Sequence, residues 1–334
     1  MHLDSRKQRM KRKERMRRRK IMWLFFIGIV IISIPFIDIM KHDTKSLEIV
    51  QADDSSNLDD KSEIKSDNKE QNNESNIYTS SNIHKNTLDN SGYLELKDDP
   101  NADDASIISK NISDLLKGNK NYPVRTDGKK VAYLTFDDGP STTNTPNILK
   151  VLDEYNIKGT FFIVGKTLEN NEEAKKLLKE IAKDGHAIGN HTYSHNYKYL
   201  YPNGTMNVDN IINDLNKNDS LMKSILGKDF SSRVIRLPGG YWSWNGRTNL
   251  KNKLVELGLE SIDWNALNGD AEGKKKNEDE LFARFKETVD NLGENADSIT
   301  ILMHDTYGKE NTVKTLPRII EYLKERGFEF RTIK

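Results

Sequence analysis

The 334-residue chain contains no cysteine. This absence excludes disulfide scaffolds, cysteine-ligated zinc or iron–sulfur sites, and thiol catalysis. The chain also lacks an excess of either charge, because 52 Lys and Arg residues stand against 51 Asp and Glu residues. A protein that binds nucleic acid through bulk positive charge is thereby excluded. Apolar residues make up only 35% of the chain, which indicates that part of it lies outside any folded core.

The near-neutral total hides three regions of different charge. Residues 1–40 carry 11 basic and three acidic residues, residues 41–120 carry 10 and 17, and residues 121–334 carry 31 of each. The chain therefore divides into a basic start, an acidic middle and a neutral remainder.

Residues 1–40 have the pattern of a membrane anchor. Residues 6–20 are densely basic, and 17 uncharged residues follow from Ile21 to Ile37. That length just suffices for a helix to cross hydrocarbon, and the basic flank predicts a cytoplasmic N-terminus. A cleaved signal peptide is the alternative, but its apolar stretch is usually shorter and ends in a small-residue cleavage site that is missing here. We predict a basic cytoplasmic segment at 1–20 and a transmembrane anchor at 21–40, with the remainder extracellular.

Residues 41–120 have the composition of a linker. They are rich in Asp, Ser, Asn and Lys and poor in aromatic residues. Such a segment buries too little apolar surface to offset the entropy of ordering the chain. We therefore predict a disordered acidic linker that holds a folded domain, residues 121–334, away from the membrane. Its last part, Ile107–Leu116, is predicted to be a short helix leading into that domain.

From residue 122 onward, short β-branched and aromatic runs alternate with helical patterns. The predicted strands are Val131–Asp138, Gly159–Val164, Ala187–Thr192, Val234–Pro238, Glu260–Asn265, Thr300–His304 and Phe328–Thr332. The predicted helices are Pro146–Tyr155, Glu172–Asp184, Asn207–Leu226, Thr248–Leu257, Asp279–Leu292 and Val313–Arg326. This alternation predicts an α/β fold, a distorted (β/α) barrel of about seven parallel strands. In a parallel barrel the carboxyl ends of the strands form one face, and active sites lie there.

Polar and titratable residues gather at the predicted strand ends. They are Asp137, Asp138, His191, His195, Arg236, Asn265, His304 and Asp305. Two histidines four residues apart suit one metal ion, although such a pair alone is weak evidence. A carboxylate as third ligand leaves positions open for water and substrate, which is typical of a catalytic site. Taken alone, the Asp-Asp-Gly-Pro segment also fits a simple turn.

Four short motifs follow one another in residues 125–334. They are Thr135-Phe136-Asp137-Asp138-Gly139-Pro140, His191-Thr192-Tyr193-Ser194-His195, Arg236-Leu237-Pro238 and Leu302-Met303-His304. In this order and at these separations they closely resemble the polysaccharide deacetylases of carbohydrate esterase family 4. The resemblance implies a distorted seven-stranded barrel that removes N-acetyl groups from chitin or peptidoglycan, or O-acetyl groups from xylan.

The resemblance also implies roles for individual residues. The ligands of a divalent metal would be Asp138, His191 and His195, with zinc expected first and cobalt, nickel or manganese as alternatives. The catalytic residues would be Asp137 as general base, Arg236 as the residue that orients it, and His304 as general acid. These roles suit amide hydrolysis, which needs an activated water, a stabilised oxyanion and a protonated leaving amine.

The predicted substrate contacts are less specific. Gly239, which follows Pro238, would donate its backbone N–H to the oxyanion, and Leu302 belongs to the last motif. Tyr241 and Trp242 lie just past a predicted strand end, and aromatic faces stack well on sugar rings. Packing of Trp242 and of Trp244 against the barrel fits the sequence equally well.

The sequence departs from the family at two points. The family often has an aromatic residue after Arg-x-Pro, where this chain has Gly239, so the substrate preference stays open. Its fourth motif usually supplies an Asp that pairs with the catalytic histidine, but Leu267 occupies the aligned position. Asp270 or Asp263 takes over this role, or His304 acts without a carboxylate partner.

The function predicted from these features is metal-dependent removal of N-acetyl groups from N-acetylglucosamine in peptidoglycan. The cell wall follows from the predicted topology, a single-pass cell-membrane protein with an extracellular catalytic domain. The alternatives are O-deacetylation, or deacetylation of chitin, poly-N-acetylglucosamine, N-acetylmuramic acid or xylan. A catalytically silent glycan-binding domain is the rival from another class. Neither a nucleic acid nor a protein partner is implied.

Overall fold

The computed structural model describes residues 93–334. The predicted anchor at 21–40 and most of the predicted linker lie outside the described residues. Within residues 93–334, no helix combines the length and the apolar character needed to cross a membrane.

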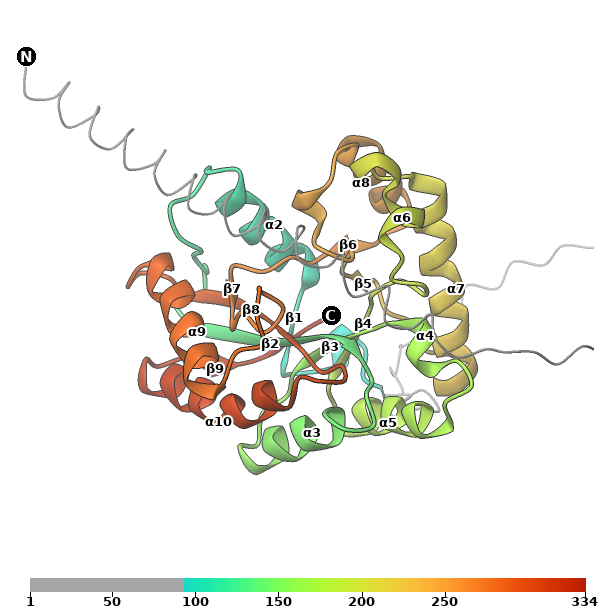
Figure 1. Cartoon of the computed structure of the whole chain (residues 1–334). Helices are drawn as coiled ribbons and strands as arrows, with labels where there is room; N and C mark the ends of the chain where they lie inside the picture. The colour runs from blue at the N-terminus through green and yellow to red at the C-terminus, as the bar shows by residue number, and fades with distance from the viewer. Residues whose placement is uncertain (1–92) are drawn as a thin grey trace, which may run out of the picture. The chain divides into compact units, whose positions relative to one another are not determined.

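A parallel sheet occupies the centre of the fold (Figure 1). Its strands lie side by side in the order β6-β5-β4-β3-β2-β8-β7, and β9 also pairs with β2. The strands are β2 (Val131–Gly139), β3 (Thr160–Ile163), β4 (Ala187–Asn190), β5 (Val234–Ile235), β6 (Glu260–Ser261), β7 (Ala266–Leu267), β8 (Ser298–His304) and β9 (Glu329–Phe330). Within residues 93–334 no pairing joins β6 to β7, so the sheet is a curled half-barrel. The predicted fold of about seven parallel strands is confirmed at this level.

Strand β2 runs through the middle of the sheet. Eight of its nine residues are buried, as is typical of a parallel strand covered on both faces. It pairs with β8 in a continuous register from Val131 opposite Ser298 to Asp137 opposite His304. This register places the predicted base directly beside the predicted acid.

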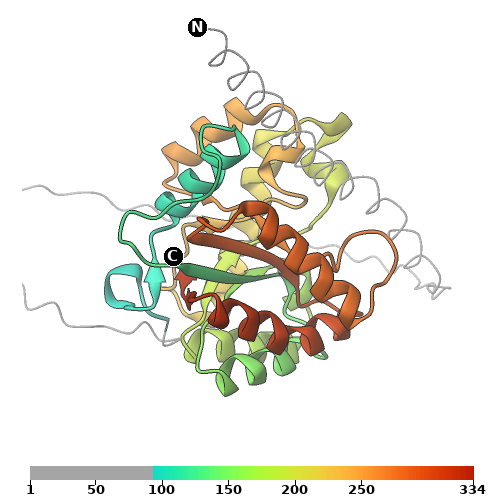
Figure 2. The ribbon, with the colours of Figure 1, turned by 90° about the vertical axis from the view of Figure 1, so that its left-hand side faces the viewer.

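Helices surround the sheet on its outer side (Figures 1 and 2). They are α3 (Thr145–Glu154), α4 (Gly165–Leu168), α5 (Glu172–Lys183), α6 (Tyr197–Leu200), α7 (Val208–Leu226), α8 (Arg247–Glu256), α9 (Glu278–Leu292) and α10 (Glu310–Glu325). Neighbouring helices pack in the order α9, α10, α3, α5, α7 and α8. Helix α10 shows why they pack, because it buries Leu316, Ile319, Ile320 and Leu323 on one face at helical spacing.

Only the start of the predicted strand Glu260–Asn265 is a strand, β6, and the chain then crosses to β7, just beyond the predicted range, at the opposite edge of the sheet. Strand β6 pairs with β5, whereas β7 pairs with β8. Between them, the carbonyl oxygens of Ile262 and Asp263 accept hydrogen bonds from the side chain of Arg236 at 2.8 and 3.3 Å. The sequence pattern missed this break because the partner of these carbonyls is a side chain far away in sequence.

The last predicted strand, Phe328–Thr332, is also divided. Strand β9 pairs with β2, whereas β10 (Thr332–Ile333) pairs with β1 (Ala102–Asp103) in a separate two-stranded sheet. The partner strand β1 precedes the predicted domain, so the sequence analysis did not foresee this pairing.

Residues 93–120, which the sequence analysis assigned to the linker, form ordered elements. Helix α2 (Ala105–Leu116) begins at Asp104, whose side chain accepts a hydrogen bond from the backbone N–H of Ser106 at 2.7 Å. It buries Ile108 and Ile112 in a cluster that includes Tyr133 of β2. The predicted helix at Ile107–Leu116 is thus present, starts two residues earlier, and belongs to the folded part of the chain.

Candidate active site

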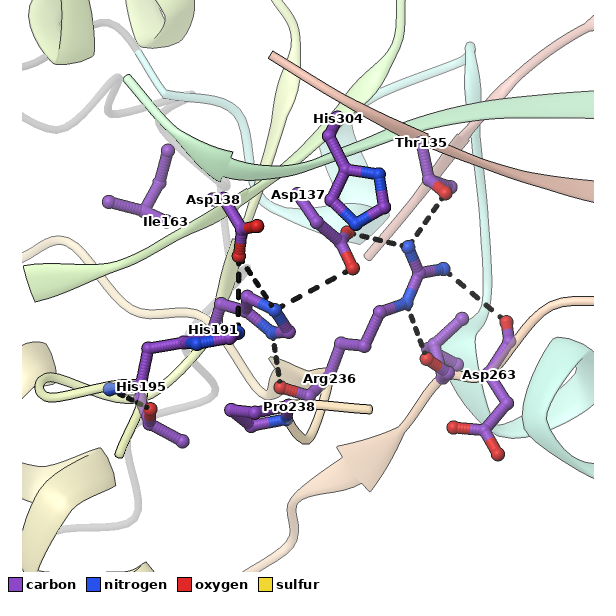
Figure 3. A network of polar contacts seen from close by, with 12 residues as sticks. Thr135, Asp137, Asp138, Ile163, His191, His195, Arg236, Pro238, Asp263 and His304 are labelled. Atoms are coloured by element: carbon purple, nitrogen blue, oxygen red, sulfur yellow. Dashed lines mark hydrogen bonds and ion pairs between the residues drawn. The ribbon is translucent and has the colours of Figure 1, made fainter. Parts of the chain in front are cut away.

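Asp137 and Arg236 form a buried ion pair at the carboxyl end of the sheet (Figure 3). Nη1 of Arg236 donates to Oδ1 of Asp137 at 2.7 Å and to Oγ1 of Thr135 at 2.8 Å. The guanidinium also lies 4.1 Å from the centre of the Phe162 ring. Because Arg236 is fully buried and its donors are engaged, it holds the Asp137 carboxylate in one orientation.

Asp138, His191 and His195 converge beside this pair (Figure 3). One ligand atom from each lies within 4.8 Å of the others. Oδ1 of Asp138 is 3.4 Å from Nε2 of His191 and 3.2 Å from Nε2 of His195. The structure therefore brings together the three residues predicted to bind a metal.

The backbone at this cluster adopts conformations that non-glycine residues seldom take. Asp138, Thr192 and His195 have φ values of 72°, 68° and 48°. Such strain costs of order 1–3 kcal/mol per residue and persists only where the surroundings enforce it. Here the side chain of Asn190 accepts from the Thr192 N–H at 2.9 Å, and that of Asp214 accepts from the Ser194 N–H at 2.8 Å.

The three side chains fit a divalent cation. Nδ1 of His191 lies 2.7 Å from the carbonyl oxygen of Arg236, and donation to that carbonyl leaves Nε2 free as a ligand. Oδ1 of Asp138 is buried and has no hydrogen-bond partner among the described residues. Burial alone would raise the pKa of Asp138, but the neighbouring histidines outweigh it and hold the pKa well below the usual range. A carboxylate that stays ionised and lacks a donor suits a positive ion.

His304 pairs with Asp270. Its Nδ1 lies 2.7 Å from Oδ1 of Asp270, and its backbone N–H donates to Oδ2 of the same carboxylate at 2.9 Å. Burial lowers the pKa of His304, but the charge of Asp270 outweighs burial and raises the pKa to about 9. The hydroxyl of Thr312 also donates to Oδ2 of Asp270, at 2.7 Å. The imidazole therefore carries a proton at neutral pH, as a general acid requires.

This geometry shows which carboxylate pairs with His304, a choice between Asp270 and Asp263 that the sequence left open. Asp263 accepts hydrogen bonds from the backbone N–H groups of Tyr241 and Trp242 at 2.9 and 3.3 Å and is not the partner of His304. Burial raises the pKa of Asp263 to about 6. Asp263 holds the turn after β5, and Asp270 pairs with His304.

Gly239 lies where an added side chain would be crowded and its backbone strained. Its φ is 74°, and an added Cβ would be 3.1 Å from the Tyr197 ring and 3.2 Å from the Trp244 ring. Among the described residues, its N–H donates no hydrogen bond to another protein group. Pro238 precedes it, beside Arg236 (Figure 3), and accepts a hydrogen bond from Nε1 of Trp244 at 3.0 Å. A glycine here thus keeps a backbone donor while neighbouring rings occupy the space beside it.

The aromatic residues after Gly240 contact other protein side chains and backbone groups. Trp244 is buried and stacks on Tyr201 with ring centroids 4.1 Å apart, which favours its packing role. The charged groups of Lys117 and Arg247 lie 5.5 and 5.4 Å from the centre of the Trp242 ring. The hydroxyl of Tyr241 donates to the carbonyl oxygen of Arg247 at 2.8 Å.

Leu302 forms a small apolar cluster with Trp264 and Leu267. Leu302 lies on β8 two residues before His304, and Leu267 lies on the neighbouring β7. Leu267, at the position where the family usually has the partner Asp, therefore packs against the sheet near His304.

Some supporting residues escaped the sequence analysis. The amide of Asn218 on α7 donates to the carbonyl oxygens of Ile163 and Thr192 and to the side chain of Asn190. A polar residue within a long helical pattern gave no signal of this contact. Asp305 was noted only as a strand-end residue, yet it is buried and accepts from the Thr145 hydroxyl at 2.6 Å.

With this geometry established, comparisons with known proteins identify the family. The family described as polysaccharide deacetylase matches residues 124–262. A peptidoglycan-N-acetylglucosamine deacetylase of Bacillus cereus is 36% identical over 215 residues, which cover 64% of this chain and 73% of the relative. The chain belongs to the polysaccharide deacetylase family. As a member, this polysaccharide deacetylase is a hydrolase.

Solved structures agree with this assignment. A carbohydrate esterase family 4 esterase of Streptococcus mutans matches this polysaccharide deacetylase with a TM-score of 0.62 and 32% identity, covering 70% of this chain and 92% of that one. The catalytic domain of a peptidoglycan N-acetylglucosamine deacetylase of Eubacterium rectale matches with a TM-score of 0.53 and 30% identity, covering 63% and 91%. The family resemblance read from the four motifs is thereby confirmed.

Proposed function

We propose that this polysaccharide deacetylase removes N-acetyl groups from N-acetylglucosamine residues of peptidoglycan in a metal-dependent reaction. The observation that carries the proposal is a convergence of side chains at the carboxyl end of one sheet. They are Asp137 with Arg236, the cluster of Asp138, His191 and His195, and His304 with Asp270. The relatives named as peptidoglycan-N-acetylglucosamine deacetylases support the choice of substrate.

The cation is proposed to bind through Asp138, His191 and His195. When bound, a divalent ion with open coordination positions polarises a carbonyl group and lowers the pKa of water. Zinc suits a set of two imidazoles and one carboxylate, and cobalt, nickel or manganese are alternatives.

Asp137 is the proposed general base. Its carboxylate is buried, held by Arg236 and 3.6 Å from Nε2 of His191 at the nearer oxygen, so it lies beside the ligand cluster. From this position it removes the proton of the attacking water. The N–H of Gly239 is proposed to donate to the oxyanion that forms when the acetyl carbonyl is attacked.

His304 is the proposed general acid. An amide nitrogen leaves only when it is protonated, and Asp270 keeps a proton on the imidazole at neutral pH. With Nδ1 engaged by Asp270, Nε2 is the atom that delivers the proton to the sugar nitrogen. The products are acetate and a glucosamine unit.

The second candidate function is O-deacetylation. The related Streptococcus mutans structure carries the name esterase, and an ester needs the same attack on an acetyl carbonyl. An alkoxide leaves more readily than an unprotonated nitrogen, so an esterase depends less on a protonated acid. A silent glycan-binding domain is less well supported, because all five residues, Asp137, Asp138, His191, His195 and His304, are present and converge.

The test uses the full-length chain in detergent with peptidoglycan, chitooligosaccharides and O-acetylated xylan as substrates. We expect acetate and free amino groups from peptidoglycan, loss of both after EDTA treatment, and recovery with zinc or cobalt. Acetate without free amines would indicate the esterase instead. No acetate from any substrate, with bound metal shown by elemental analysis, would refute the enzyme.

Replacing the base separates chemistry from metal binding. Asp137→Asn should lower kcat by roughly 10²–10⁴-fold, because proton removal by a positioned base contributes about that much. Its metal content should stay that of the wild type, since Asp137 is not one of the three ligands. Asp209→Asn, on the first turn of α7, is the matched control and should keep full activity. Unchanged turnover in Asp137→Asn would show that the base is misassigned.

The cellular location is part of the proposal. We place the catalytic domain outside the cell membrane, next to the wall, on the strength of the basic residues 6–20 and the uncharged run from Ile21 to Ile37. Protease added to intact protoplasts should then degrade residues 93–334. Complete protection of this part in intact protoplasts, with degradation after lysis, would contradict the location.

A further inference from the structure

Tyr307 presents an exposed aromatic ring next to the catalytic acid. It lies three residues after His304 in the loop that leads from β8 to α10, and 52% of the residue is exposed. Of the large apolar side chains that are exposed in residues 93–334, only Tyr199 and Tyr307 are aromatic. An exposed ring at the rim of a site built for a polymer is a candidate contact for that polymer.

The ring is held in place through its hydroxyl group. The Tyr307 oxygen lies 3.1 Å from Oγ1 of Thr142 and accepts from the Thr142 N–H at 3.4 Å. Thr142 belongs to the loop after β2, four residues after Asp138. Tyr307 therefore connects the loop that follows β8, the strand of His304, to the loop that follows β2, the strand of Asp138.

Further bonds tie the same two loops together. The side-chain amide of Asn144 donates to the carbonyl oxygen of Thr306 at 2.6 Å, and the Ser141 hydroxyl donates to the carbonyl oxygen of Asp305. These two bonds fix the backbone just before Tyr307 to the loop that follows β2. A ring fixed at its tip and at its backbone loses little side-chain entropy when it binds a ligand.

Tyr307 lies close enough along the chain to reach a sugar beside the one at His304. Three residues of chain place its Cα within about 11 Å of the Cα of His304. The sugar that loses its acetyl group must lie against His304 itself, so Tyr307 is suitably placed for the next ring along the glycan. Its hydroxyl is already engaged, which leaves the apolar face of the ring for contact.

We propose that Tyr307 is a platform on which the pyranose ring adjacent to the reacting N-acetylglucosamine stacks. The ligand class is a β-linked polymer or oligomer of N-acetylated sugars, and the inference rests on the proposed function. Tyr307 is a specificity-determining residue in this role, because it favours chains of several sugars over a single sugar.

The test compares full-length wild-type protein with Tyr307→Ala and Tyr307→Phe on N-acetylglucosamine and on its β-1,4-linked pentamer. For the pentamer we expect Tyr307→Ala to lose roughly twofold to tenfold in kcat/KM, mainly through KM, the range expected for one aromatic contact. For the monosaccharide kcat/KM should stay unchanged. Tyr307→Phe keeps the ring and should behave as the wild type.

The control is Tyr155→Ala, at the end of α3 remote from the site, where the hydroxyl donates to Glu321 at 2.7 Å. It should leave both substrates unaffected. Two results would overturn the platform. One is an equal loss of kcat/KM on monosaccharide and pentamer in Tyr307→Ala. The other is a loss in Tyr307→Phe as large as in Tyr307→Ala, which would show that the hydrogen bond to Thr142 matters instead of the ring.

A binding measurement separates this proposal from the proposed function. Calorimetry with the pentamer compares Asp137→Asn with the double variant Asp137→Asn/Tyr307→Ala, so turnover is not needed. We expect the double variant to bind roughly twofold to tenfold more weakly. Equal affinity, or no binding to either protein, would refute the platform whether or not the wild type deacetylates any glycan.

Discussion

His304 keeps its proton because of one neighbouring residue. The Asp270 carboxylate accepts from both its ring and its backbone, and the pKa of Asp270 itself falls to about 2 despite burial. A histidine whose pKa in the folded protein is about 9 stabilises the fold fully below pH ~6.5 and loses this contribution as the pH rises through 9. The protonation of the proposed acid, His304, and part of the stability of the protein thus depend on the same pair, His304 and Asp270.

Asp270→Asn should reveal this dependence. Without the negative charge the pKa of His304 falls, so the alkaline limb of kcat/KM should move down by roughly one to three pH units. The stability difference from wild type should be larger at pH 6 than at pH 10. The measurements are a pH–rate profile and urea unfolding at both pH values.

Asp279→Asn is the control for this prediction. Asp279 is exposed on α9, where it pairs with Arg318, so its replacement should leave the alkaline limb in place. A wild-type pH profile in Asp270→Asn would mean that another group controls the alkaline limb.

At the level of elements, helix α7 positions the loop from His191 to His195. Asn218, fully buried, donates to Ile163 at the end of β3 and to Asn190 and Thr192 at the end of β4. Asp214, one turn earlier, accepts from the backbone and hydroxyl of Ser194. The helix therefore supports the strained loop that holds His191 and His195 together.

Asn218→Ala should destabilise the protein by about 1–3 kcal/mol, because buried carbonyl groups lose their donor. Metal affinity should fall as well, since the loop between the two histidines loses its support. Urea unfolding and a competitive zinc titration are the measurements. Ser220→Ala, on the exposed side of the same helix, should change stability by less than about 0.5 kcal/mol. Wild-type metal affinity in Asn218→Ala would contradict the positioning role.

At the level of the whole molecule, helix α2 and strand β1 extend the folded part towards the N-terminus. Strand β1 pairs with β10 near the end of the chain, and Arg233 pairs with the Asp104 cap at 2.6 Å. Helix α2 buries Ala105, Ile108, Ile112 and Leu115. These contacts make residues 93–120 part of the domain.

Removing this extension should cost stability. The fragment 121–334 lacks three large buried aliphatic side chains of α2, each worth roughly 1.5–3 kcal/mol, so it should be less stable than 93–334 by several kcal/mol. Thermal unfolding of the two fragments measures the difference. The fragment 117–334, which also lacks α2, should resemble 121–334. Equal melting temperatures for 93–334 and 121–334 would contradict this prediction and favour a domain that begins at residue 121, as the composition indicated.

Much of the site was predictable because its residues lie at strand ends in short motifs. Asp137, Asp138, His191, His195, Arg236 and His304 all lie at the carboxyl end of the sheet, where a parallel arrangement must bring them together. Their catalytic roles remain predictions. The choice of Asp270 over Asp263 was not predictable, because both carboxylates lie in one irregular segment and only its path decides which faces His304.

By itself, the sequence determined the alternation of strands and helices, the family and the set of titratable residues, since these depend on local pattern and on short motifs. Tertiary structure decided the open half-barrel, the partner of His304, the support from Asn218 and the inclusion of α2. Each of these depends on contacts between residues far apart in the chain, such as Arg236 with the carbonyl groups between β6 and β7. Local pattern carries no information about such contacts, because the same polar residue satisfies its hydrogen bonds equally well in solvent.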